Sequence, residues 1–167
     1  MPRAAQSGDH IDPEKRIMSE EQQTPEGVTL EVRKTIAATP ERLFTAWTDP
    51  AQLVAWWGPE GVACIGAEVD ARVGGNYRIG NRLPDGMEIW IVGTFEVIER
   101  PRLLTYSWLI EGMQGDAERV TILFEARGAG TEVIVTHEKI PNATARDQHA
   151  YGWKGCLEGL ATLVTTP

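Results

Sequence analysis

The sequence has few cysteines and no long apolar run. Only Cys64 and Cys156 occur among its 167 residues. Two cysteines do not make a disulfide framework, so a reducing, cytoplasmic location is predicted. No apolar stretch approaches the ~20 residues that a membrane-spanning helix needs. The first residues are polar, and we therefore expect no signal peptide.

Basic residues are also scarce. Lysine and arginine number 16 against 24 aspartates and glutamates, and the formal net charge is −8. Binding to a phosphate backbone or to an anionic membrane surface usually needs a basic stripe or patch. The charge therefore argues against a nucleic acid or a membrane as partner.

The third scarce residue is histidine, with only His10, His137 and His149. Their spacing to each other and to the cysteines does not match that of zinc ligands. We therefore expect no metal and no cofactor. No arrangement of nucleophile, acid and base stands out either, so no catalytic residue is assigned and an enzyme is the less favoured class.

Residues 1–26 contain almost no large apolar side chain. Such a segment cannot bury enough surface to offset the entropy lost on ordering, which predicts a disordered head. Met18 is an alternative translation start to Met1. The remaining residues, 27–167, are predicted to form one domain.

Apolar and polar side chains alternate with a period of two over several short segments, which predicts strands. We expect them at 28–36, 62–69, 75–80, 88–99, 103–110, and around 120–124 and 133–137. The connections between them are short, which favours antiparallel pairing. Gly74-Gly75 is interpreted as a bulge rather than a phosphate-binding loop, because a strand follows it and not a helix.

Two signals of a capping residue followed by proline, Thr39-Pro40 and Asp49-Pro50, predict two short helices after the first strand. The longest helical pattern is 143–164, with apolar residues at spacings of three and four. Gly152, Gly155 and Gly159 flank its apolar face. Each glycine costs a helix about 1 kcal/mol, so the three indicate either a close backbone approach or space left empty.

This order of elements predicts an α+β fold. An open antiparallel sheet with one apolar face needs a cover, and the last helix is the only long candidate. We therefore expect a curved sheet of six to seven strands wrapped around a long C-terminal helix, with two short helices after the first strand.

Several segments carry a resemblance to a known family. They are residues 32–36, 39–50, Trp56-Trp57-Gly58-Pro59, 72–77, 130–133 and Gly152-Trp153, in that order. Together they resemble domains similar to the C-terminal part of the activator of heat-shock-protein-90 ATPase, over about residues 28–164. These belong to the START-like (SRPBCC) superfamily with a helix-grip fold. The resemblance implies a cavity between sheet and helix, in which members of the superfamily bind lipids, sterols, polyketides or aromatic compounds; a minority catalyse ring closures or hydroxylations.

The candidate ligand-binding residues are large or polar side chains at inward strand positions, on the apolar face of the last helix or at element ends. They are Trp56, Trp57, Tyr77, Tyr106, Trp108, His137, Trp153 and Leu157. His137 is either a core residue with satisfied hydrogen bonds or a polar anchor for a ligand. Neighbouring helical residues point about 100° apart, so at most one of Trp56 and Trp57 is expected to face a cavity.

The function favoured at this point is a soluble intracellular protein that binds a small apolar or aromatic ligand. A cyclase- or hydrolase-type enzyme using the same cavity is one alternative. A co-chaperone-like interaction module, with a chaperone as partner and a place in the stress response, is the other. A monomer and a homodimer are both open.

Overall fold

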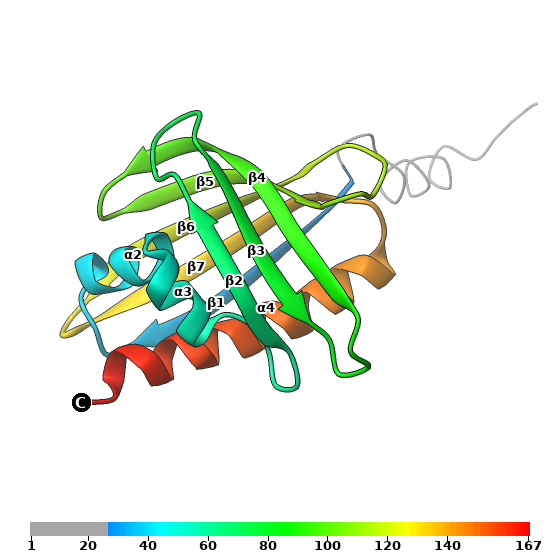
Figure 1. Cartoon of the computed structure of the whole chain (residues 1–167). Coiled ribbons are helices and arrows are strands. Elements are labelled where there is room, and N and C mark those ends of the chain that lie inside the picture. The colour runs from blue at the N-terminus through cyan, green and yellow to red at the C-terminus, as the bar shows by residue number, and fades with distance from the viewer. Residues whose placement is uncertain (1–26) are drawn as a thin grey trace, which may run out of the picture.

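The computed structural model describes residues 27–167, so the predicted head and the choice between two start sites lie outside the described residues. Seven strands form one antiparallel sheet in the order β1-β7-β6-β5-β4-β3-β2 (Figure 1). Their bounds are β1 Val28–Ile36, β2 Ala63–Val69, β3 Asn76–Arg82, β4 Glu88–Glu99, β5 Leu103–Ile110, β6 Glu118–Arg127 and β7 Gly130–Ile140. Every neighbouring pair is antiparallel, which confirms the predicted fold class.

Three helices accompany the sheet: α2 Pro40–Thr48, α3 Pro50–Trp56 and α4 Ala143–Thr165. The two predicted caps are confirmed. The Thr39 side chain accepts a hydrogen bond from the backbone N–H of Arg42, and Asp49 accepts one from Ala51. Each cap satisfies a backbone N–H that the first helical turn leaves without a partner. None of the helices in residues 27–167 is long and apolar enough to span a membrane.

Gly74-Gly75 lies at the end of the turn between β2 and β3, and the predicted bulge is present there. The N–H of Gly74 donates to Phe95 O and the N–H of Phe95 donates to Gly75 O, so two residues oppose one residue of β4. Gly74 has a φ of +85°, in the left-handed region that glycine adopts without strain. A Cβ on Gly75 would collide with the backbone of Asp70. The two glycines therefore serve a tight turn.

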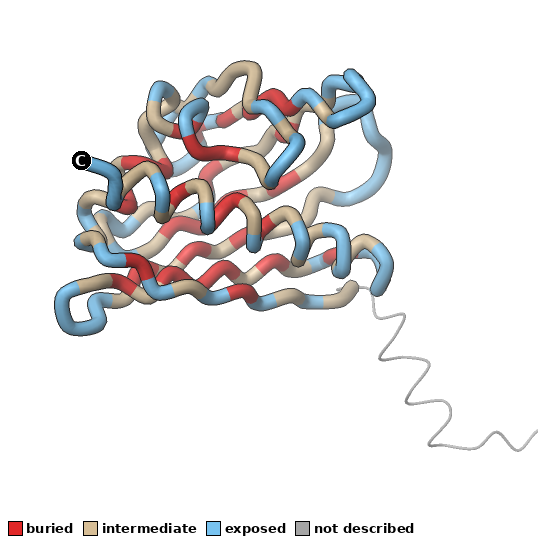
Figure 2. The backbone as a smooth tube through the Cα atoms, turned by 90° about the horizontal axis from the view of Figure 1, so that it is seen from below, coloured by how far each residue is buried: buried red, intermediate tan, exposed pale blue. Residues whose placement is uncertain are grey.

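The core lies between the sheet and α4. Side chains at alternate positions of the central strands are fully buried, among them Val120 and Ile122 of β6, and so is Leu160 of α4. Buried stretches recur along α4 and along the strands, while the turns are exposed (Figure 2). Figure 1 shows α4, in orange to red, crossing the strands, with its C-terminal half beside α2 and α3.

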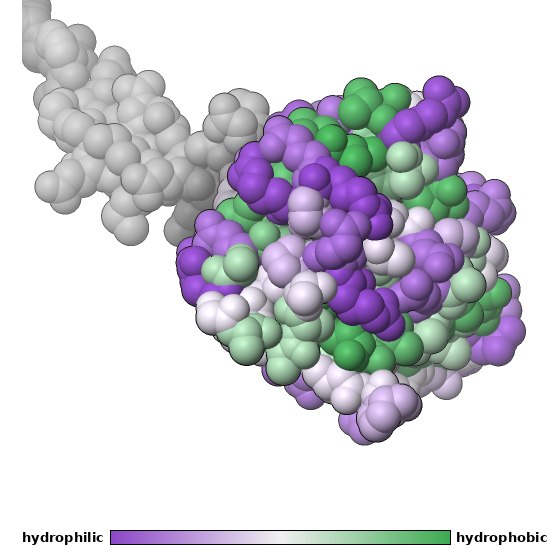
Figure 3. Space-filling view, turned by 90° about the vertical axis from the view of Figure 1, so that its left-hand side faces the viewer, coloured by the Kyte–Doolittle hydropathy of each residue, from purple (hydrophilic) through white to green (hydrophobic). Residues whose placement is uncertain are grey.

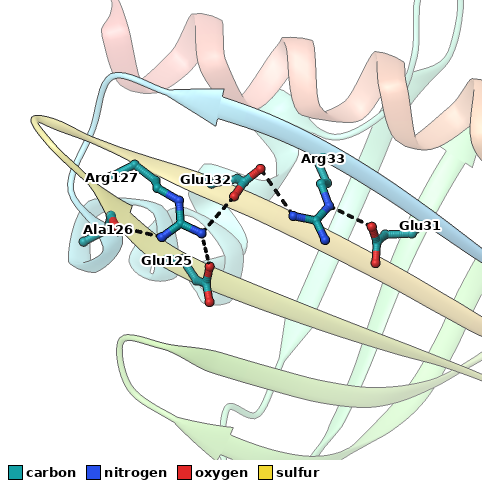
Figure 4. Close-up of polar contacts among 6 residues, drawn as sticks. All are labelled: Glu31, Arg33, Glu125, Ala126, Arg127 and Glu132. Atoms are coloured by element: carbon teal, nitrogen blue, oxygen red, sulfur yellow. Dashed lines mark hydrogen bonds and ion pairs between the residues drawn. The ribbon is translucent and has the colours of Figure 1, made fainter.

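The opposite face of the sheet carries charged side chains on β1, β7 and β6, which we call the outer ladder: Glu31, Arg33, Glu132, Arg127 and Glu125 (Figure 4). They alternate in sign, and all but Glu132 are between about a third and a half exposed. Figure 3 shows the end of the molecule that carries the β6–β7 turn, where hydrophilic residues predominate and hydrophobic ones are interspersed.

Candidate functional site

A cavity of about 360 Å³ lies between α4 and the sheet. It exists because α4 does not run evenly over the strands. Its backbone comes close to β1 and, over a shorter stretch, to β7, α2 and α3, with no comparable approach to β3, β4 or β5. The gap left over the ends of β3, β4 and β5 is the cavity. Its volume falls within the range of small-molecule sites.

The sheet side of the cavity is apolar except for one amide. Ile91 of β4 and Trp108 and Ile110 of β5 line it together with Asn81 of β3. Asn81 follows the inward alternation of its strand, is only 4% exposed, and its Nδ2 has no hydrogen-bond partner within residues 27–167. A buried amide without a partner costs about 1–3 kcal/mol. The cavity therefore has a polar group that the protein itself does not satisfy.

The helix side of the cavity shows what the three glycines of α4 do. A Cβ on Gly152 would meet no atom within 4 Å, and Gly152 lines the cavity. A Cβ on Gly155 would lie 2.5 Å from Pro59, and one on Gly159 would lie 2.5 Å from the carbonyl oxygen of Trp56. The two roles predicted for the glycines, close backbone approach and empty space, therefore both occur in α4. Gly155 and Gly159 allow close packing, and Gly152 borders empty space.

Cys156 also lines the cavity but is not a nucleophile. Burial raises the pKa of its thiol to about 12. Its Sγ accepts a hydrogen bond from the backbone N–H of Gly58 at 3.4 Å. Only a thiolate attacks readily, so Cys156 acts here as a small apolar wall residue.

Trp153 holds the centre of an aromatic cluster at the inner end of the cavity. Its ring stacks on Trp47 at 6.1 Å between centroids and meets the ring of Trp57 edge-on at 5.5 Å. Trp108 lies on the other side, edge-on to His137 at 5.2 Å. Offset and edge-to-face contacts of this kind add about 0.5–1.5 kcal/mol per pair to the burial of the rings. These ring contacts hold the aromatic side chains of the cavity wall in place.

Four side chains form a chain of hydrogen bonds beside the cavity, which we call the buried polar chain. The indole N–H of Trp153 donates to His137 Nδ1 at 3.0 Å. His137 Nε2 lies 2.7 Å from Glu118 Oε1, and His149 Nε2 lies 3.0 Å from the same oxygen. The two imidazole rings stack at 4.4 Å. The chain joins β6 and β7 to the N-terminal half of α4.

The electrostatics of this chain follow from its burial. Burial raises the pKa of Glu118, but the hydrogen bonds from His137 and His149 outweigh it and bring the pKa below its ordinary value. Burial lowers the pKa of His137 although Glu118 favours its charged form. Glu118 is therefore ionised and accepts from both histidines, and His137 is neutral with its proton on Nε2.

Two histidines and a carboxylate could also be metal ligands, since their donor atoms lie within 4.8 Å of one another. A histidine that binds a metal through one ring nitrogen normally donates the proton of the other to an acceptor. His137 Nδ1 instead faces the N–H of Trp153. If a metal were bound to His137 Nε2, the ring proton would lie on Nδ1. The N–H groups of His137 and Trp153 would then point at each other. The geometry fits a hydrogen-bond chain and not a metal centre.

A model of the family described as "Activator of Hsp90 ATPase homolog 1-like protein" matches residues 37–165. The chain belongs to this family. No protein matches in a search of curated proteins. Solved structures also resemble this AHSA1-like protein, and three of them are described here. A protein from Chromobacterium violaceum is 28% identical, with a TM-score of 0.77 and coverage of 83% of this chain and 98% of the other. The AHSA1 protein from Silicibacter pomeroyi is 25% identical, with a TM-score of 0.70 and coverage of 81% and 96%. The AHSA1-like protein from Aeromonas hydrophila is 25% identical, with a TM-score of 0.67 and coverage of 82% and 92%.

The AHSA1-like domain brings three of the eight candidate residues to the cavity wall: Trp57, Trp108 and Trp153. The others are buried elsewhere: Trp56, Tyr77, Tyr106, His137 and Leu157. Their polar atoms have partners inside the protein. The Trp56 N–H donates to Ala46 O, the Tyr77 hydroxyl donates to Ser107 O, and the Tyr106 hydroxyl accepts from the Trp47 N–H. Contact with a ligand stays a prediction for all eight.

The sequence interpretation did not single out Asn81, His149 and Glu118 as site residues. Asn81 carried a usable signal, because Tyr77, Ile79 and Asn81 alternate inward and the third is an amide. The strand predicted around 120–124 leaves out Glu118, whereas Glu118 is the first residue of β6.

Proposed function

We propose that this AHSA1-like protein binds a small, uncharged, largely apolar or aromatic molecule in the cavity between α4 and strands β3–β5. The lining carries the proposal: a pocket of about 360 Å³, open to solvent, is walled mainly by apolar and aromatic side chains, which is the usual make-up of a small-molecule site. The family fold, which typically encloses hydrophobic ligands, supports the same function.

The chemistry of the wall supports an uncharged ligand. Apolar side chains predominate, among them three tryptophans and three isoleucines, and no lysine, arginine, aspartate or glutamate lines the cavity. An ionised group there would lack a counter-charge, which makes its transfer from water unfavourable. No observation on residues 27–167 favours the enzyme or the chaperone-associated alternative over binding, and both stay untested predictions, as does a cytoplasmic location.

N-phenyl-1-naphthylamine tests the proposal, because its fluorescence rises in an apolar site. We expect saturable binding at one equivalent. Its sulfonated counterpart, 1-anilinonaphthalene-8-sulfonate, adds a charge to the same ring system and should bind at least about tenfold more weakly.

Two variants locate the site. Gly152→Phe places a ring where a Cβ meets open space, and it should weaken binding of N-phenyl-1-naphthylamine by about tenfold or more. Lys154→Phe adds the same ring to an exposed position of α4 outside the cavity and should leave the affinity unchanged. Equal affinities of the two variants, or no saturable binding by the wild type, would contradict the proposal. Urea unfolding of each variant verifies that both are folded.

A further inference from the structure

We propose that His149 is the polar anchor of this cavity, and that the ligand is an uncharged aromatic molecule whose hydroxyl group donates a hydrogen bond to His149 Nδ1. This inference rests on the proposed function and names the ligand class. It comes from the direction of the hydrogen bonds in the buried polar chain.

The direction is set at Trp153. An indole N–H can only donate, so His137 Nδ1 must accept. The proton of the neutral His137 ring is then on Nε2 and points at Glu118 Oε1. A carboxylate without its proton can only accept. His149 must therefore also present an N–H to Glu118, from its own Nε2.

One ring nitrogen at the end of the buried polar chain, His149 Nδ1, takes part in none of these hydrogen bonds. His149 Nδ1 has no hydrogen-bond partner within residues 27–167, and with the ring proton on Nε2 this nitrogen carries a lone pair. His149 lines the cavity. Its ring is held between the stacked ring of His137 at 4.4 Å and the ring of Trp108, edge-on at 4.8 Å. The acceptor is thus held in place before any ligand arrives.

The Glu118 carboxylate on the far side of the His149 ring makes the site more selective for a neutral hydrogen-bond donor. Glu118 accepts the Nε2 proton of His149 at 3.0 Å, and a bond of this kind polarises the imidazole and strengthens Nδ1 as an acceptor. The same negative charge disfavours a carboxylate or phenolate ligand, and the cavity wall has no cationic residue to compensate. A carbonyl or ether oxygen cannot donate. A neutral hydroxyl on an aromatic ring meets all of these requirements, because Trp57, Trp108 and Trp153 line the same space.

The experiment compares 2-naphthol with 2-methoxynaphthalene, which has the same rings but no O–H. Both are titrated by competition with N-phenyl-1-naphthylamine at about pH 8. We expect wild type to bind 2-naphthol about tenfold more tightly than 2-methoxynaphthalene, the size of one good hydrogen bond. In His149→Phe this preference should vanish while 2-methoxynaphthalene still binds.

A spectroscopic readout reports the bond itself. Excited 2-naphthol is a strong acid and gives its proton to a hydrogen-bonded base, so the bound probe should emit as naphtholate in wild type. In His149→Phe it should emit as neutral naphthol. Asp147→Phe places the same ring on the exposed side of this turn and serves as the matched control with wild-type emission.

The outcomes separate the two proposals. If neither naphthalene displaces N-phenyl-1-naphthylamine from the wild type, the proposed function fails and this inference with it. If both bind with equal affinity, or if His149→Phe weakens both alike and leaves the naphtholate emission in place, only the assignment of His149 is overturned. Retained binding of 2-methoxynaphthalene shows that the variant is folded.

Discussion

Strands β6 and β7 carry charged and polar groups on both of their faces. These groups are exposed to solvent on one face and buried on the other. On the outer ladder, Arg127 contacts Glu132 at 3.2 Å, and Glu132 contacts Arg33 at 3.5 Å. On the inner face, Glu118 and His137 lie 2.7 Å apart in the buried polar chain. The side chain of Arg127 is 53% exposed, and that of His137 is 0% exposed.

This difference in exposure decides whether water can replace a partner that a substitution removes. Water solvates an outer charge when its partner leaves, so an exposed ion pair contributes only about 0.2–1 kcal/mol. An inner group has no such substitute, and its desolvation cost remains when its partner is removed. We therefore expect similar substitutions on the two faces to differ severalfold in cost.

The largest effect is expected from His137→Leu. It leaves the N–H of Trp153 without an acceptor and deprives Glu118 of one of its two donors. Urea unfolding should show a loss of about 3 kcal/mol, the sum of one orphaned N–H and one charge-assisted hydrogen bond. Thr136→Val, one residue away on the same strand, is the control with little change. A loss below about 1 kcal/mol for His137→Leu would mean that water reaches the chain.

The same variant has a pH signature. Burial holds the pKa of His137 in the folded protein below its ordinary value of 6.5, so the unfolded chain binds more protons as the pH falls through that value, and wild-type stability decreases. Glu118, whose folded pKa lies below 4.5, adds a further loss at lower pH. His137→Leu should abolish the part of this stability loss that occurs at the higher pH values, where His137 takes up its proton. Parallel stability curves for variant and wild type between pH 8 and pH 5 would contradict it.

A change of the opposite sign is expected at Asn81, the inner-face group that has no partner for its Nδ2. Asn81→Leu replaces an unsatisfied amide with an apolar side chain in an apolar wall, and it should stabilise the ligand-free protein by about 1 kcal/mol. Thermal unfolding measures it, with Gln114→Leu as the same kind of change at an exposed position outside the cavity. A destabilised Asn81→Leu would show that the amide already has a partner, such as a bound water.

The smallest effect is expected on the outer ladder. Glu132→Gln removes the charge that joins Arg33 to Arg127. The cost should be about 0.5 kcal/mol and should shrink further in about 1 M salt, where charges are screened over roughly 3 Å. Urea unfolding at two salt concentrations tests both statements. A loss as large as that of His137→Leu would remove the contrast between the two faces.

The fold could be predicted because its signals are local. Alternation gave strands β4 and β5 with their observed bounds, and Thr39 and Asp49 marked the starts of α2 and α3. The inner chain could not be predicted in the same way. Whether Glu118, His137 and His149 meet depends on the angle at which α4 crosses the sheet, and periodicity carries no information on that angle.

The order of strands also bears on how the chain reaches this structure. Within residues 27–167, β1 is the first strand, and its single neighbour in the sheet is β7, the last strand. Val32 pairs with Val135, which lies 103 positions further along the chain (135 − 32). Closing so long a loop has to precede the contacts that stabilise it, and such topologies fold slowly. During synthesis β1 therefore stays unpaired until nearly the whole domain has left the ribosome, and its edge is then open to other chains.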